Sequence, residues 1–228
     1  MSKLAFFLLF LVLVPFSSIA QDWAQLDVYR EANKKLAQKM TMENRIVFFG
    51  NSITIGWSQT QPSFFRDKPY INRGIGGQTT PQMLVRFRQD VIDLKPRVVV
   101  ILAGTNDIAG NTGPMTLDET LANLKSMTEL ALSNNIAVVL CSVLPASDYP
   151  WRPGLRPDIK IPKLNAMIKE YANKQGAIYL DYFSAMVNGE QGLDPDLAHD
   201  GVHPTKKGYE IMAPLAEKAI KKALDESP

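Results

Sequence analysis

The sequence is poor in cysteine and histidine, and this shortage excludes several kinds of site. Its 228 residues include one cysteine, Cys141, and two histidines, His199 and His203. A single cysteine rules out an internal disulfide and any zinc site built from several thiolates. Cys141 stands inside an apolar run, which favours a buried structural thiol over a nucleophile. Two histidines four positions apart make a poor metal cluster, so we expect neither a metal site nor a cofactor.

The sequence also lacks a strong net charge and a long apolar run. Hydrophobic residues make up 46% and charged residues 21%, and the net charge is +2, which is the balance of an ordinary globular protein. No run of Lys or Arg exceeds two residues, which argues against a nucleic-acid-binding face. The first apolar run, at residues 4–14, is too short for a membrane-spanning helix, which needs about 20 residues.

Residues 1–20 have the layout of a secretory signal peptide. Lys3 precedes the apolar run, and Ser18-Ile19-Ala20 supplies a small-residue cleavage site. No cysteine follows for lipid attachment, so we expect no stable membrane anchor after cleavage. The expected mature chain is a single domain over residues 21–228, exported to the periplasm or the exterior of a bacterial cell.

Short β-branched segments alternate with longer segments of helical period along the rest of the chain. Several of the short segments are nearly continuous apolar runs, as in parallel strands covered on both faces. This alternation predicts a parallel α/β sandwich with right-handed crossovers. Strands are predicted at residues 45–49, 70–73, 97–103, 136–143 and 177–181, and helices at 24–40, 80–94, 117–134, 159–175 and 206–224.

Four polar motifs either follow a predicted strand or precede the last predicted helix. Ligands of open parallel sheets bind outside the carboxyl ends of the strands, so the motifs are expected at one edge. Each motif alone also fits a structural role, such as a helix N-cap, a turn or a solvated loop. The motifs are Gly50-Asn51-Ser52-Ile53, Gly74-Ile75-Gly76-Gly77-Gln78-Thr79, Gly104-Thr105-Asn106-Asp107 and Asp200-Gly201-Val202-His203-Pro204.

Together these motifs contain the groups that acyl transfer requires: a nucleophile, a base, an orienting carboxylate and oxyanion donors. The hydroxyl of Ser52 is a poor nucleophile until an imidazole takes its proton, so the base is His199 or His203. His203 is preferred because it stands three residues after Asp200, within reach of that carboxylate on a tight turn.

In this order, the motifs resemble those of the SGNH hydrolases, also called GDSL-like lipases and acylhydrolases. The resemblance runs from residue 45 to about residue 213. It implies a flavodoxin-like three-layer α/β/α sandwich with a five-stranded parallel sheet. It also implies a nucleophile, Ser52, an oxyanion hole formed by the amides of Ser52 and Gly77 and the side chain of Asn106, and a triad completed by Asp200 and His203.

The sequence departs from the family pattern at two positions. Asn51 stands where an acid usually precedes the nucleophile, and Gln78 replaces a common Asp. Gly77 is chosen over Gly76 because the family's glycine usually stands directly before that Asp. Since an amide can donate as well as accept, the two replacements leave the local hydrogen bonding open.

The resemblance implies a secreted serine esterase that acts through an acyl-Ser52 intermediate. Export favours a short-chain ester, acetyl above all, on a carbohydrate, and the glycine motif is similar to that of platelet-activating-factor acetylhydrolases. The expected partner is a small-molecule or glycan ester. The alternatives are a phospholipase, lysophospholipase or thioesterase, and a catalytically silent carbohydrate-binding protein, although the latter would be expected to lose part of the triad.

Residues 145–162 form a proline-rich segment that contains Trp151 and follows the fourth predicted strand. The segment is either a stiff connector or one wall of the site. Trp151 suits stacking against a sugar ring, although packing is the commoner role for such a residue.

Overall fold

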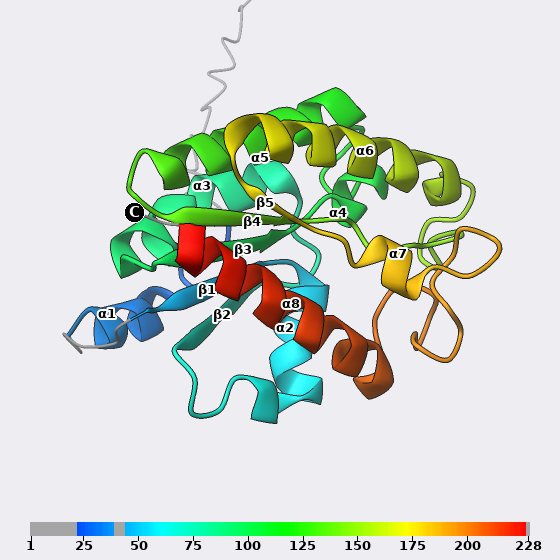
Figure 1. Cartoon of the computed structure of the whole chain (residues 1–228). Coiled ribbons are helices and arrows are strands. Elements are labelled where there is room, and N and C mark those ends of the chain that lie inside the picture. The colour runs from blue at the N-terminus through cyan, green and yellow to red at the C-terminus, as the bar shows by residue number, and fades with distance from the viewer. Residues whose placement is uncertain (1–21, 39–43, 227–228) are drawn as a thin grey trace, which may run out of the picture.

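The computed structural model describes residues 22–38 and 44–226, so the signal peptide expected at residues 1–20 lies outside the described part. One parallel sheet runs through the centre of the molecule (Figure 1). Its order, β2-β1-β3-β4-β5, is that of flavodoxin-like folds and confirms the predicted five-stranded sheet. The strands are β1 (Ile46–Gly50), β2 (Tyr70–Gly74), β3 (Val98–Leu102), β4 (Ala137–Cys141) and β5 (Ile178–Leu180).

The neighbouring strands β1 and β3 are buried along their whole length and consist mainly of β-branched and aromatic residues. Such side chains pack well on a pleated surface that helices cover on both faces. Gly50 pairs in register with Gly74 on one side and with Leu102 on the other, so three neighbouring strands end at the same level. The segments that leave them therefore meet at one edge.

Two helical layers cover the sheet (Figure 1). One contains α3 (Thr80–Asp90), α5 (Leu117–Leu132) and α6 (Pro157–Gln175), and the other contains α2 (Ser52–Thr60) and α8 (Lys206–Glu226). Alternate residues of β1 face the two layers: Phe49 belongs to the first apolar core and Phe48 to the second. The remaining elements are α1 (Arg30–Gln38), η1 (Pro62–Phe64), η2 (Ile92–Leu94), α4 (Thr105–Ile108) and α7 (Phe183–Met186).

The observed helices differ from the sequence predictions in several places. The helix predicted at residues 80–94 ends at Asp90, and the short helices α4 and α7 were not predicted. The helix predicted from residue 24 begins at Arg30. The helix predicted from residue 159 begins inside the proline-rich segment, because Pro157 occupies its first position, where proline fits well. No helix was predicted over α2, whose β-branched residues give no helical pattern; burial of Ile53 and Trp57 against the sheet stabilises it.

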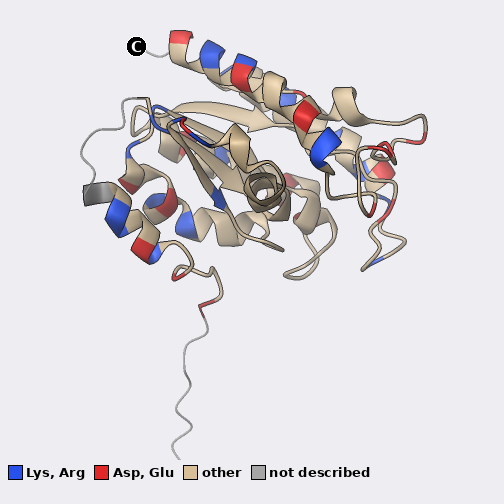
Figure 2. Ribbon diagram, turned by 90° about the horizontal axis from the view of Figure 1, so that it is seen from below, with Lys and Arg blue, Asp and Glu red and all other residues tan. Residues whose placement is uncertain are grey.

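Charges of both signs alternate along α8, where Lys206–Glu210 and Lys222–Glu226 are spaced as helical ion pairs (Figure 2). Among the described helices, none is both long and apolar enough to cross a membrane.

Candidate active site

Ser52 lies at the tight turn where β1 gives way to α2. Asn51 is the N-cap of this helix, because its side-chain oxygen accepts a hydrogen bond from the amide of Ile53 at 3.0 Å. In this motif, the residue that caps the helix is therefore Asn51 and not Ser52. At the end of β1, a Cβ on Gly50 would meet the Thr54 hydroxyl oxygen at 2.1 Å, so the close approach of helix and strand requires glycine there.

His203 lies between Ser52 and Asp200. Its Nε2 is 2.9 Å from the Oγ of Ser52, and its Nδ1 is 2.8 Å from the Oδ2 of Asp200. Because a carboxylate can only accept, Nδ1 carries the proton in the neutral ring and Nε2 is free to accept from the serine hydroxyl. The geometry is that of a nucleophile, its base and a group that orients the base.

The Asp200 carboxylate is held by the backbone of its own turn. Its Oδ1 accepts from the amides of Val202 at 3.0 Å and His203 at 2.8 Å. Burial alone would raise the pKa of Asp200, but these bonds and the His203 ring outweigh it, so the pKa lies below its ordinary value. The carboxylate is therefore ionised at neutral pH.

The second histidine has a different place in the same loop. The backbone amide of His199 donates to the carbonyl of His203 at 2.9 Å, and Ala198 forms an isolated bridge with Pro204. These backbone contacts close the loop that presents His203. The structure thus brings His203, and not His199, to the hydroxyl of Ser52.

Gly77 lies in the loop after β2, and Asn106 contacts the next residue of that loop, Gln78. Gly77 has a φ of +74°, in the region that favours glycine, and its carbonyl accepts from the side chain of Asn111 at 3.0 Å. The buried side-chain amide of Asn106 donates to the carbonyl of Gln78 at 2.9 Å. Since this amide carries two hydrogens, a second remains for an oxyanion. Asn106 lies inside α4 and is not its N-cap, which is Gly104.

The two departures from the family pattern have different consequences. The Asn51 oxygen accepts from a helix amide, a bond that an aspartate would also form. Gln78 accepts from the Arg86 Nε at 2.5 Å and donates to the Ala24 carbonyl at 2.8 Å. A carboxylate cannot form this second bond.

Asp107 is a buried part of the site to which the sequence analysis gave no role. Its Oδ1 accepts from the amide of Thr80 at 2.9 Å and from the Thr80 hydroxyl at 2.5 Å, which joins α4 to the start of α3. Burial raises the pKa of Asp107. Asp107 belongs to the same motif as Asn106 and directly follows it, so the sequence did contain a signal that it lies at the site.

The proline-rich segment passes beside the triad. Trp151 is 44% exposed, its ring centroid is 6.0 Å from that of His203, and its other neighbour is Tyr149 at 5.2 Å. Arg152 anchors the segment by donating to the carbonyls of Ala109 at 2.9 Å and Gly110 at 2.6 Å. Trp151 therefore both packs on Tyr149 and offers an accessible surface next to the base.

Cys141 is buried in the sheet, as predicted, and burial raises the pKa of its thiol. Within residues 22–38 and 44–226, no three His, Cys, Asp or Glu side chains gather as metal ligands.

Comparison with known proteins places this geometry in a family. Residues 48–211 match the model of the GDSL-like Lipase/Acylhydrolase family. The structure superposes with a TM-score of 0.85 on a GDSL-like lipase from Bacteroides thetaiotaomicron that is 49% identical, over 88% of this chain and 99% of that one.

Two curated relatives are acetylxylan esterases. The chain is 26% identical over 214 residues to that of Xylanibacter ruminicola, covering 78% of this chain and 43% of the relative. It is also 26% identical over 151 residues to that of Geobacillus stearothermophilus, covering 63% of this chain and 68% of the relative. The chain thus spans less than half the length of the Xylanibacter protein.

Proposed function

The chain belongs to the GDSL-like lipase/acylhydrolase family, a family of carboxylic ester hydrolases, and we propose that it removes short acyl groups, acetyl above all, from a carbohydrate. The observation that carries the proposal is the continuous contact from Ser52 through His203 to Asp200, with separations of 2.9 and 2.8 Å. This is the arrangement that turns a serine hydroxyl into a nucleophile.

In the first half of the reaction, the acyl group moves to Ser52. His203 Nε2 takes the hydroxyl proton as Oγ bonds to the ester carbonyl carbon, and Asp200 stabilises the resulting imidazolium. When the tetrahedral intermediate collapses, the bond to the alcohol oxygen breaks and His203 returns its proton to that oxygen. Water then repeats the sequence on the acyl-serine, which releases the carboxylic acid and restores the Ser52 hydroxyl.

The negative charge on the carbonyl oxygen needs fixed donors. The proposed donors are the backbone amides of Ser52 and Gly77 and the side-chain amide of Asn106. Ser52 is the first residue of α2, whose amino end favours negative charge. Asn106 is oriented by its bond to the Gln78 carbonyl, so its position is set before substrate binds.

The carbohydrate part of the proposal is supported by three observations. The curated relatives at 26% identity are acetylxylan esterases. Trp151 offers an exposed aromatic face beside His203, where the alcohol side of an ester would leave, and sugar rings stack on such faces. The signal-like residues 1–20 support export of the protein to the compartment where acetylated glycans are met.

The test is hydrolysis of p-nitrophenyl esters from acetate to palmitate, together with acetate release from acetylated xylooligosaccharides. We expect activity that is highest on acetate or butyrate, release of acetate from the oligosaccharide, and loss of both in Ser52→Ala. Ser58→Ala is the matched control, because Ser58 lies on the same helix and its hydroxyl bonds only locally, to the Ile55 carbonyl. Activity that rises toward palmitate would indicate a long-chain acylhydrolase instead, and no hydrolysis of any ester would indicate a binding protein.

A further inference from the structure

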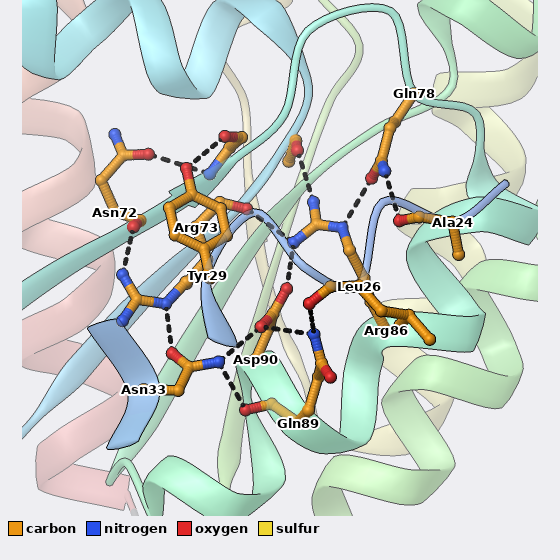
Figure 3. Close-up of polar contacts among 12 residues, drawn as sticks. Ala24, Leu26, Tyr29, Asn33, Asn72, Arg73, Gln78, Arg86, Gln89 and Asp90 are labelled. Carbon is orange, nitrogen blue, oxygen red and sulfur yellow. Dashed lines mark hydrogen bonds and ion pairs between the residues drawn. The ribbon is translucent and has the colours of Figure 1, made fainter. Parts of the chain in front are cut away.

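Arg86 is a fully buried charge beside the carboxyl ends of β1 and β2 (Figure 3). Its Nη2 donates to the Gly50 carbonyl at 2.9 Å, and its Nη1 donates to the Arg73 carbonyl at 2.9 Å and to Asp90 at 3.0 Å. Its Nε donates to the Gln78 side chain at 2.5 Å. Burial lowers the pKa of Arg86 to about 10, so the guanidinium is charged at neutral pH. Burying a charge is costly unless it is paired, and here Asp90 pairs with it.

These bonds connect two parts of the catalytic site, the turn that carries Ser52 and the loop that carries Gly77. Gly50 stands two residues before Ser52, at the end of the strand that presents the nucleophile. Gln78 follows Gly77, and its backbone carbonyl orients the Asn106 amide. One guanidinium therefore ties the nucleophile turn to the loop that carries the proposed oxyanion donors.

The N-terminal segment encloses this network. Three glutamine side chains on α3 or just before it each donate to a backbone carbonyl in residues 23–26. Gln78 donates to Ala24 at 2.8 Å, and Ala24 is itself buried. The other two bonds run from Gln82 to Trp23 and from Gln89 to Leu26, both at 2.7 Å. The Tyr29 hydroxyl adds a bond to the Gly74 carbonyl at 2.5 Å (Figure 3).

We propose that Arg86 and Gln78 are positioning residues for ester hydrolysis, and that the Ala24 carbonyl completes their support by holding the Gln78 amide. The proposal rests on the function assigned above, because it concerns the same oxyanion donors. Glutamine suits this arrangement where the family usually has aspartate, since an amide can accept from Arg86 and donate to Ala24 at once, whereas a carboxylate can only accept.

The substitution Gln78→Glu distinguishes the two hydrogen bonds of the Gln78 side chain, one to Arg86 and one to Ala24. Glutamate keeps the acceptor for Arg86 but turns an oxygen toward the Ala24 carbonyl, so the N-terminal support is lost. Gln82→Glu is the matched control. Its side-chain oxygen still accepts from the Thr79 amide in the capping box, and only the bond to Trp23, away from the oxyanion donors, disappears.

Arg86→Lys tests the guanidinium itself, and Arg45→Lys is its control. Arg45 is also buried, but it precedes β1 at the amino end of the strand, away from the catalytic edge, and its Nη1 donates to the Leu94 carbonyl. Both substitutions replace a buried planar guanidinium with a point charge. A loss of activity that reflects general destabilisation of the fold would occur in both variants.

The experiment measures kcat and KM on p-nitrophenyl acetate well below each variant's Tm, and the inhibition constant of a trifluoromethyl ketone that mimics the tetrahedral intermediate. For Gln78→Glu and Arg86→Lys we expect kcat to fall about tenfold or more, KM to change less than about threefold, and inhibitor binding to weaken by the same factor as kcat. Gln82→Glu and Arg45→Lys are expected to keep kcat within about threefold.

Unchanged kcat in the folded Gln78→Glu variant would overturn the inference, and so would an equal loss in Arg45→Lys. If Arg86→Lys fails to fold, Gln78→Glu decides the question. Ser52→Ala is measured alongside. Wild-type activity that is lost in Ser52→Ala but retained in Gln78→Glu would overturn this inference and leave the proposed function standing, whereas an inactive wild-type protein would overturn both.

Discussion

The Oγ of Ser52 and the Nε2 of His203 are 2.9 Å apart, although the two residues are separated by 151 positions in the chain. Ser52 is placed by the end of a buried central strand, and His203 by a short loop that enters α8. Parallel strands that end in register bring the first of these to the catalytic edge, and the backbone bonds of the Asp200 turn bring the second.

Replacement of Asp200 by asparagine tests the role of the carboxylate without removing the turn. The asparagine oxygen still accepts from the amides of Val202 and His203, but its NH₂ group faces Nδ1 and favours the tautomer with the proton on Nε2. We expect kcat to fall by about 10³- to 10⁴-fold with little change in Tm. Steady-state kinetics and thermal melts check this. A loss of less than about tenfold would remove Asp200 from the mechanism.

Asn106→Ala removes one proposed oxyanion donor. One such donor contributes about 3 kcal/mol to the transition state, so kcat should fall by about a hundredfold or more while KM changes little. Asn134→Ala is a suitable control, because the Asn134 side chain bonds to the Leu130 carbonyl at an exposed helix end. Kinetics on p-nitrophenyl acetate are sufficient. If kcat drops less than about threefold, Asn106 does not hold the oxyanion.

Trp151→Ala separates recognition of the acyl acceptor from the chemical step. The exposed ring beside His203 should matter for an ester on a sugar and little for an aryl ester. Stacking of this kind is worth about 0.5–1.5 kcal/mol, so kcat/KM on acetylated xylooligosaccharides should fall about three- to tenfold, with recovery in Trp151→Phe. Equal losses on p-nitrophenyl acetate would show that Trp151 supports the loop and not the sugar.

Asp107 gives a prediction for stability against pH. Burial raises its folded-state pKa above the ordinary value of 3.8, so the folded protein keeps the proton where the unfolded chain has lost it. The contribution of Asp107 to stability therefore declines as pH rises from about 3.8 to the raised pKa, and is constant above it. Asp107→Asn cannot lose a proton and can still accept from Thr80.

Calorimetric Tm values of the wild type and Asp107→Asn, measured from about pH 4 to about pH 8, check this sign. The Tm of the variant should rise relative to that of the wild type as pH increases through the window. A Tm difference that does not vary with pH, or a Tm of the variant that falls relative to that of the wild type as pH increases, would contradict the raised pKa.

Local sequence pattern was sufficient to find the strands of the sheet, but not their order. A run such as Val98–Leu102 is apolar throughout because helices cover both of its faces, and all five predicted strands are present. The same reasoning missed α2, because Ile53 and Trp57 make it helical by packing against the sheet and not by their own preference. The helical conformation of α2 is therefore set by its tertiary contacts.

The motifs that follow β1 to β3 were found because the carboxyl ends of parallel strands share an edge. Arg86 was not found, since its bonds to Gly50 and Gln78 join segments with no common local pattern. Its spacing to Asp90, four residues along a helix, was the one usable signal and indicates an ion pair on either a buried or an exposed face. The bond from Gln78 to the Ala24 carbonyl involves backbone, which carries no sequence signal at all.

The most direct test of the central claim is the mass of the protein during turnover. The protein is mixed with excess p-nitrophenyl acetate, quenched in acid within the first turnovers and analysed by peptide mass spectrometry. We expect the mass of one acetyl group on the peptide that contains Ser52, and no such mass on the same peptide of Ser52→Ala. More of the acetylated peptide should accumulate in a water-poor mixture without alcohol, because such a mixture slows deacylation. Rapid hydrolysis with no acetyl group on Ser52 even in the mixture that slows deacylation, or full activity in Ser52→Ala, would contradict a serine esterase mechanism.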